Sequence, residues 1–254
     1  MIKNISIRLF CEVTLGVGEK INLEKDQTHY LKNVMRCKIN DKIIVFDNIT
    51  GEYIAEIVNI DKRFIKIEIL EKTKPRCVPG DVWLIFCPLK KSRTDFLVEK
   101  STELGLRIFL PTLSDKTQTK TVSIDRFKKN IVEAVEQCGG TFIPEILPVN
   151  SLAKVIEELP EDRMIIFCDE SLESRNINYG LLSKKPKKVA LLVGPEGGFS
   201  ESERNLLRTK KNVLPVSLGN RILRAETAAV VALTMWHGLI GDWHKRVDHQ
   251  NYES

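Results

Sequence analysis

The chain has 254 residues and a mass of 29.0 kDa, which is enough for one large domain or two unequal ones. Hydrophobic residues make up 43% and the formal charge is +5, so the chain is neither intrinsically disordered nor basic throughout. No apolar run approaches the roughly 20 residues that span a bilayer, and we expect no membrane segment.

The cysteines and histidines indicate the compartment and the metal content. All six cysteines are scattered without a C-x-x-C pair, which argues against a disulfide framework. The four histidines lie far from any cysteine or glutamate at ligand spacing. We therefore expect a reducing, cytoplasmic environment and no bound metal.

Residues 1–72 have the pattern of a small β-barrel. β-Branched residues alternate with polar ones in four segments, and polar turns join the last three of them. We expect strands at 5–10, 43–47, 53–60 and 64–70, with a short helix near 26–36. Two prolines and a glycine in 73–81 then predict a linker.

From residue 82 the pattern changes to alternating strands and helices. This alternation predicts a mostly parallel sheet covered on both faces, in a domain over 82–245 followed by a tail at 246–254. A capping box formed by Ser200 and Glu203 marks the start of one helix. We expect strands at 82–86, 107–110, 164–168, 189–193 and 213–218, and helices at 93–104, 125–138 and 225–241.

The segment 191–199 joins a predicted buried strand to a helix through Gly194-Pro195-Glu196-Gly197-Gly198. A tight turn alone would account for these residue types. Neither a G-x-G-x-x-G nor a P-loop is present, Pro195 lacks a backbone donor, and Glu196 would repel a phosphate. The loop therefore favours a ligand with amine, hydroxyl and cationic groups, such as S-adenosylmethionine (SAM).

The segment 217–228 places two arginines and a glutamate at another strand-to-helix turn. Glu226 is favourable near a helix N-terminus for structural reasons alone. Arg221 and Arg224 are not, because a cation at that end costs roughly 0.3–1 kcal/mol. The two arginines therefore indicate an anionic partner.

These segments belong to a set of motifs that run in order through most of the chain. The chain resembles the bacterial ribosomal-RNA uracil-N3 methyltransferases of the SPOUT superfamily. The motifs that carry the resemblance are Arg8-Leu9-Phe10, His29-Tyr30-Leu31, Val34-Met35-Arg36, 90–100, Thr102-Glu103-Leu104-Gly105, Glu133-Ala134, Glu136-Gln137-Cys138, 194–198, Leu218-Gly219, Arg221-Ile222-Leu223-Arg224 and Glu226-Thr227.

The resemblance implies an N-terminal RNA-binding barrel of the PUA type and a C-terminal α/β domain threaded into a trefoil knot. In such proteins the knot binds SAM, and two subunits pair so that the RNA and cofactor sites meet. The cofactor residues it implies are Cys168, Leu192, Gly194, Glu196, Gly197, Gly198, Leu218, Gly219, Ile222, Leu223 and Thr227, with Asp169 as a further contact.

The resemblance also implies a substrate, 16S rRNA within the small ribosomal subunit. The chemistry of methyl transfer to uracil N3 then suggests roles for charged residues, as a hypothesis. Arg224 would stabilise the negative charge that develops on the uracil, and Glu226 would take the proton or orient Arg224. The residues expected to hold RNA are Arg8, His29, Arg36, Lys90, Lys91, Arg93, Lys100 and Arg221.

One departure and three alternatives stay open at this point. Family members tend to carry basic residues where this chain has Gly140 and Phe142, which puts one phosphate contact in question. A related enzyme acting on tRNA or on a ribose hydroxyl would share the SAM loop. A non-enzymatic RNA-binding protein would show no SAM affinity, and a nucleotide-binding enzyme is disfavoured by the missing phosphate motifs.

Overall fold

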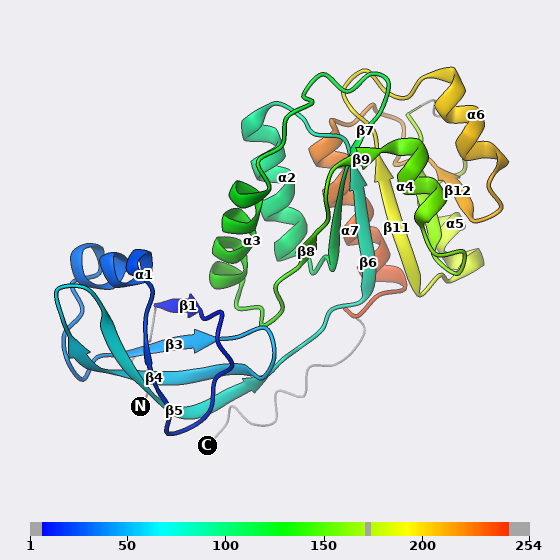
Figure 1. Ribbon diagram of the computed structural model, residues 1–254. Helices are drawn as coiled ribbons and strands as arrows, with labels where there is room; N and C mark the ends of the chain where they lie inside the picture. Colours follow the sequence, from blue (N-terminus) through cyan, green and yellow to red (C-terminus); the bar gives the residue numbers. More distant parts are fainter. Residues whose placement is uncertain (1–6, 171–173, 244–254) are drawn as a thin grey trace. The chain divides into compact units, whose positions relative to one another are not determined.

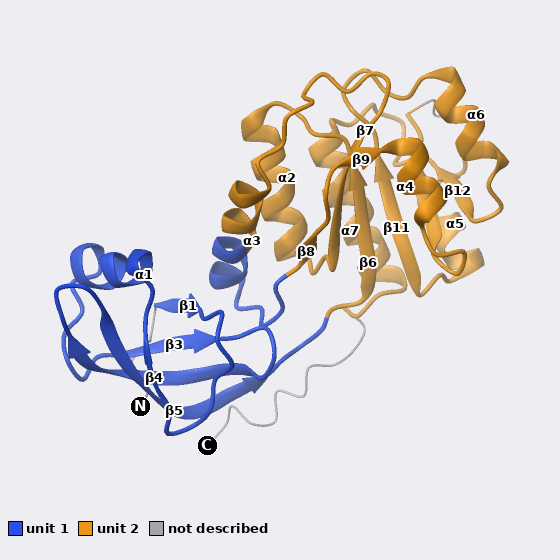
Figure 2. Cartoon of the chain, in the orientation of Figure 1, with its two compact units in different colours: residues 1–78, 132–143 blue, residues 79–131, 144–254 orange. Residues whose placement is uncertain are grey.

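The computed structural model describes residues 7–170 and 174–243 (Figure 1). The chain forms two compact units (Figure 2). Unit 1 takes the described residues up to Val78 together with Val132–Ile143, and unit 2 takes the remainder. Each unit is described by itself below.

Unit 1 is built on a five-stranded sheet with the order β1-β3-β4-β5-β2. Its elements are β1 (Arg8–Phe10), β2 (Lys20–Asn22), α1 (Lys25–His29), the π-helix η1 (Tyr30–Val34), β3 (Lys42–Phe46), β4 (Gly51–Ile60) and β5 (Ile65–Pro75). β1 pairs with β3 in parallel, and the other neighbours are antiparallel. The short strand β2 was not predicted, because only one apolar residue, Ile21, marks it.

Alternation places every second residue of the unit 1 strands in a common core. Ile43 and Val45 on β3, Ile57 on β4, and Ile65 and Ile67 on β5 are fully buried there. The same two-residue period allowed these strands to be predicted from the sequence, within a few residues at their ends.

Unit 2 contains a parallel sheet with the order β12-β10-β11-β6-β7-β8, and β9 pairs with β7. Its elements, with α3 shared between the units, are β6 (Asp81–Phe86), α2 (Lys91–Glu103), β7 (Ile108–Leu113), α3 (Ile124–Cys138), β8 (Glu145–Ile146), β9 (Asn150–Ser151), α4 (Leu152–Glu158), β10 (Met164–Cys168), α5 (Ile177–Lys184), β11 (Lys188–Val193), α6 (Glu201–Thr209), β12 (Val213–Val216) and α7 (Ala225–Leu239). The parallel α/β sheet predicted from the alternating pattern is confirmed.

Helices cover the sheet of unit 2 in two groups. α7 contacts β11, α2 and α5, whereas α4 contacts α6 and β7 (Figure 1). Leu192 of β11 and Phe167 of β10 are buried in the core that includes α4 and α6. The elements β8, β9, α4 and α5 were not predicted, because each is too short for its periodicity to stand out.

The units differ in extent from the domains expected from the sequence. β5 continues to Pro75 and β6 begins at Asp81, so the segment expected as a linker is short and partly β-structure. The chain also returns to unit 1 through Val132–Ile143, which lies inside the range expected for the C-terminal domain. Contacts between residues more than 120 positions apart hold this segment in unit 1, and no local pattern reports them.

Three further findings concern the described residues as a whole. No helix among them is both long and apolar enough to cross a membrane. Within the same part of the chain, no group of histidine, cysteine and acidic side chains is arranged to hold a metal ion. All six cysteines are free thiols.

Candidate functional site

A pocket in unit 2 lies beyond the carboxyl ends of the adjacent strands β10, β11 and β12. This edge is where open parallel sheets bind their ligands. Both segments singled out in the sequence meet here. The pocket is lined by Cys168, Asp169, Glu170, Val193, Gly194, Pro195, Glu196, Gly198, Leu218, Gly219, Arg221, Ile222, Leu223, Arg224, Ala225 and Ala228.

The loop after β11 follows a course that its glycines permit. The amide of Gly198 donates to the carbonyl of Pro195 at 2.9 Å, and Gly198 has a φ of +66°, in the left-handed region. A Cβ built on Gly194 would lie 2.7 Å from the ring of the buried Phe199. Larger residues at either glycine would therefore displace the loop or a neighbour.

The capping box predicted at Ser200 anchors the end of this loop. Ser200 Oγ accepts from the amide of Glu203 at 3.3 Å, and Glu203 Oε2 accepts from the amide of Ser200 at 2.8 Å. Glu203 Oε1 also accepts from the amide of Asp115 at 2.8 Å. The loop is thus tied both to α6 and to the segment that follows β7.

The end of β10 forms an acidic wall of the pocket. Asp169 and Glu170 are both held by Arg204 of α6, whose Nη1 lies 2.7 Å from Asp169 Oδ1. Ser174 Oγ donates to Asp169 Oδ2 at 3.3 Å. Beside them, burial raises the pKa of the Cys168 thiol to about 12, so this side chain is neutral at physiological pH.

The opposite wall comes from the turn between β12 and α7. Arg224 is the N-cap residue of α7, with an extended backbone and no side-chain capping bond. The side chains of Arg221 and Arg224 are exposed and form no ion pair with any described residue. Two unpaired cations beside a helix N-terminus remain available for an anionic group.

Glu226, in the first turn of α7, is a buried carboxylate with an incomplete set of partners. Its side chain is 10% exposed, and Oε1 lies 3.8 Å from Nε of Arg93. Oε2 has no hydrogen-bond partner among the described residues. Arg93 Nη1 also donates to Glu196 of the pocket loop at 3.4 Å, so Arg93 links α2, the loop and α7.

Comparison with known proteins identifies the family. The family model for the RNA methyltransferase domain matches residues 76–237, and that for the RNA methyltransferase PUA domain matches residues 23–70. The Ribosomal RNA small subunit methyltransferase E of Buchnera aphidicola subsp. Acyrthosiphon pisum is 32% identical over 95% of this chain and 97% of its own length. The chain belongs to the ribosomal RNA small subunit methyltransferase E family.

Another relative and two solved structures are similar over comparable lengths. The Rickettsia conorii protein of the same name is 29% identical over 89% of this chain and 93% of its own. The Neisseria gonorrhoeae structure, solved bound to SAM, has a TM-score of 0.83 at 27% identity and covers 93% of this chain and 99% of its own. A Legionella pneumophila structure in complex with SAM has a TM-score of 0.85 at 27% identity, covering 93% and 98%. The family resemblance inferred from the motifs is thereby confirmed.

In this family member, most residues expected at the cofactor line the pocket, and three do not. Leu192 is fully buried in the core with α4 and α6, because alternation along β11 turns it away from the side where Val193 lies. Gly197 and Thr227 are exposed outside the lining. The sequence did not single out Glu170 or its partner Arg204, since no motif marks either.

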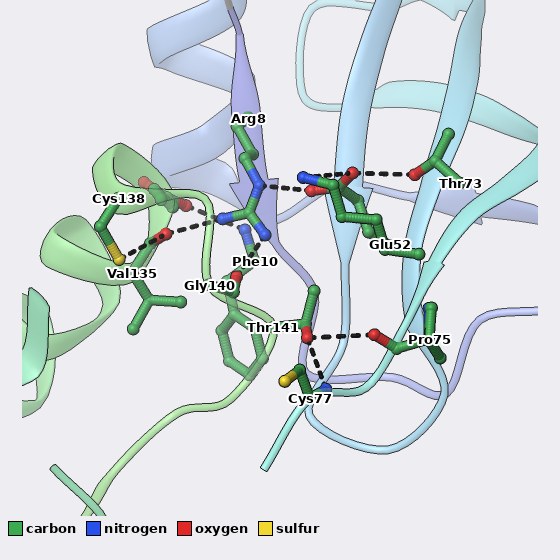
Figure 3. A network of polar contacts seen from close by, with 12 residues as sticks. Arg8, Phe10, Glu52, Thr73, Pro75, Cys77, Val135, Cys138, Gly140 and Thr141 are labelled. Atoms are coloured by element: carbon green, nitrogen blue, oxygen red, sulfur yellow. Dashed lines mark hydrogen bonds and ion pairs between the residues drawn. The ribbon is translucent and has the colours of Figure 1, made fainter. Parts of the chain in front are cut away.

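Arg8, expected to hold RNA, has a structural role instead (Figure 3). Its Nε donates to Glu52 at 2.8 Å, Nη1 donates to the carbonyl of Val135 at 2.7 Å, and Nη2 contacts the carbonyl of Gly140. The guanidinium also lies 3.9 Å from the ring centre of Phe46. With its side chain only 9% exposed, Arg8 donates to the carbonyls at the C-terminal end of α3 and is largely enclosed by these contacts.

Both positions that depart from the family pattern have contacts within unit 1. Gly140 contributes its carbonyl to Arg8, so a backbone atom is used there. The ring of Phe142 has Arg76 at 5.1 Å from its centre, so a cation faces this position from another segment of unit 1.

The other residues expected to hold RNA fall into two groups. The ammonium group of Lys100 donates to Glu103 at 2.8 Å and to Glu99 at 2.7 Å. These hydrogen bonds raise the pKa of Lys100 and pair its charge with two carboxylates. Arg93 is engaged with Glu196 and Glu226. Lys90 and Lys91 at the start of α2, and His29 and Arg36 in unit 1, are exposed.

Proposed function

We propose that this protein is a SAM-dependent methyltransferase that methylates N3 of a uridine in the 16S rRNA of the small ribosomal subunit. The observation that carries the proposal is the pocket at the ends of β10, β11 and β12, which gathers both family motifs. Relatives bearing the name Ribosomal RNA small subunit methyltransferase E match nearly the whole chain, which supports the same substrate class.

The side chains that line the pocket fit SAM. The carboxylates of Asp169, Glu170 and Glu196 suit the ammonium, the sulfonium and the ribose hydroxyls. Apolar side chains at Leu218, Ile222 and Leu223, with Ala225 and Ala228, suit the adenine ring. When bound, SAM supplies an electrophilic methyl group on its sulfonium.

The residues of this chain would then position the uridine and handle its proton. Removal of the N3 proton leaves negative charge on the ring nitrogen and the flanking carbonyl oxygens. Arg224, exposed at the pocket and without an ion-pair partner among the described residues, would stabilise that charge. Glu226 would accept the proton at Oε2, the buried oxygen that no described group satisfies.

The remaining parts of the proposal concern organisation. We assign RNA binding to the barrel over residues 1–72 and catalysis to residues 82–245, with the cytoplasm as the site of action. Arg221, Lys90 and Lys91 would contact RNA beside the pocket. We further propose a trefoil knot around the SAM loop and a homodimer, both of which follow from membership of the family.

Nucleoside mass spectrometry tests the function directly. Unmodified small ribosomal subunits are incubated with the protein and SAM, and their nucleosides are analysed. We expect a new 3-methyluridine, whose position is then found by mapping the fragment. Absence of any methylated nucleoside while SAM still binds would contradict the substrate, and tRNA would be assayed next.

A further inference from the structure

Unit 1 contains a second hollow with a volume of about 460 Å³. Of the site residues expected from the sequence, only His29 lines it. It lies between the helical segment formed by α1 and η1 and the connection from β4 to β5. Two hydrogen bonds join these sides: Lys32 Nζ donates to the carbonyl of Asp61 at 3.2 Å, and the amide of Ile65 donates to Thr28 Oγ1 at 3.2 Å.

The lining of this hollow consists almost entirely of hydrogen-bond donors. Besides Thr28 it comprises Lys25, His29, Lys32, Asn33, Lys62 and Arg63. Four of these side chains are cations, and no carboxylate lines the hollow. A concave surface of this composition attracts anions, because like charges gathered in one place raise the local potential.

The cations of the hollow are not neutralised by neighbouring carboxylates, whereas three other cations of unit 1 are. Arg8 and Lys74 pair with Glu52, and Lys20 pairs with Glu68. None of the four cations of the hollow forms an ion pair with a described residue, and the nearby Asp61 uses Oδ1 to accept from the amide of Arg63 at 3.2 Å. Their charges are therefore left for a ligand.

The backbone beside the hollow is irregular. The amide of Met35 donates to the carbonyl of Tyr30 at 3.0 Å, a spacing of five residues that defines the π-turn. Arg36 follows with a φ of +54°, a backbone conformation that residues other than glycine rarely adopt. π-Turns and strained residues of this kind are concentrated at functional sites.

We propose that this hollow, which we call the unit 1 basic hollow, binds phosphate groups of the RNA backbone of the substrate. The proposal rests on the proposed function, and the residues that line the hollow all fall within 23–70, the match to the RNA methyltransferase PUA domain. The lining has no aromatic or aliphatic wall for a base, so it favours a phosphodiester backbone over a free nucleotide. Lysines act on phosphates as point charges without reading sequence.

The double variant Lys32→Ala/Lys62→Ala tests the proposal, because it removes one cation from each side of the hollow. We expect KM for small subunits to rise about tenfold, while kcat and the Kd for SAM stay unchanged. The slope of log affinity against log salt should fall by about 1 to 2, as expected for two lost phosphate contacts. The variant Lys32→Arg/Lys62→Arg should restore both values, which excludes a general effect on folding.

Lys38→Ala/Lys42→Ala provides the matched control, since both lysines are exposed in unit 1 and lie outside the hollow. An unchanged KM and salt slope in the Lys32/Lys62 variant, with an active wild type, would overturn the proposal. Micromolar binding of pyrophosphate or AMP that the double variant loses, with RNA affinity unaltered, would also overturn it in favour of a free phosphate ligand. If the wild type transfers no methyl group but RNA affinity still falls as expected, the hollow is supported and the proposed reaction is wrong.

Discussion

Arg204 Nη1 donates to Oδ1 of Asp169 at 2.7 Å, and the same guanidinium contacts Glu170. One residue of α6 thus fixes two carboxylates at the end of β10, where both line the pocket. Arg204 itself does not line the pocket, so its contribution to SAM binding would be that of a positioning residue.

We expect Arg204→Met to raise the Kd for SAM about tenfold, because the two carboxylates lose the charge that orders them. Isothermal titration calorimetry measures this directly. Arg208→Met is the matched control: Arg208 lies on the same helix and pairs with Glu201 at 3.7 Å, with both side chains largely exposed. Equal SAM affinity in the two variants would contradict the positioning role.

Arg224→Ala and Glu226→Gln should separate chemistry from cofactor binding. We expect each to lower kcat by a factor of about 10² to 10⁴, with a much smaller change in the Kd for SAM. Single-turnover methyl transfer and calorimetry on the same preparations give the two quantities. Equal losses of turnover and SAM affinity would instead assign the residues to the cofactor site.

Gly197 and Gly198 are neighbours in the loop after β11, and a substitution at each position tests the shape that this loop needs for SAM binding. At Gly198 the φ of +66° disfavours any Cβ, and a Cβ there would collide with the Glu170 carboxylate. At Gly197 the nearest atom to a built Cβ is 3.4 Å away, and φ is not in the left-handed region. We therefore expect Gly198→Ala to weaken SAM binding at least tenfold and Gly197→Ala to change it less than threefold, about 0.65 kcal/mol. Reversed effects would place Gly197, and not Gly198, at the cofactor.

Much of the architecture could be predicted because periodicity reports burial. The alternation in β3, β4 and β5 and the apolar runs of β6, β10 and β11 reveal strands buried on one or both faces. Short elements such as α5 lack enough turns for a pattern, and β2 has a single apolar residue. The inclusion of Val132–Ile143 in unit 1 depends on contacts between distant residues, which no window of sequence contains.

The sequence predicted those parts of the candidate site that consist of residues adjacent in the chain. Gly194 to Gly198 and Arg221 to Glu226 carry unusual combinations of residues at strand ends, and both segments meet at one edge of the sheet. Arg204 has no such signal, because its role depends on where α6 packs. The contacts of Arg8 also depend on packing, since a motif arginine can donate to a backbone carbonyl as well as to a phosphate.

Arg8→Ala should therefore reduce stability, with RNA affinity affected only through folding. Removing Arg8 leaves the buried Glu52 with only Lys74 and Thr73, both on Oε1, and two carbonyls at the end of α3 lose the Arg8 donor. We expect the free energy of unfolding of unit 1 to fall by about 3 kcal/mol, measured by urea denaturation. Lys42→Ala, exposed on β3, should change it by less than about 0.5 kcal/mol. A raised KM for RNA at unaltered stability would restore the RNA-binding role.

The contacts of Asp242 should make the stability of unit 2 depend on pH. Its Oδ1 lies 2.7 Å from Nδ1 of His237, and its Oδ2 accepts from the amide of Gly80 at 2.8 Å. The hydrogen bond with His237 lowers the pKa of Asp242 below the ordinary value of 3.8, and the Gly80 amide adds to the effect against partial burial. Because the pKa is lower in the folded state than in the unfolded state, the stabilisation is fully present above pH 3.8 and is lost as pH falls through the folded pKa.

Asp242→Asn should consequently be less stable than the wild type at about pH 5, where Asp242 is ionised in both the folded and the unfolded state. Below pH 3.8 the two proteins should converge, since protonation removes the same charge from the wild type. Urea midpoints measured from pH 7 to pH 3 give the difference, and Glu161→Gln, an exposed carboxylate in the same unit, controls for the loss of one charge. A difference that grows as pH falls from about 5 to about 3 would contradict a lowered pKa of Asp242.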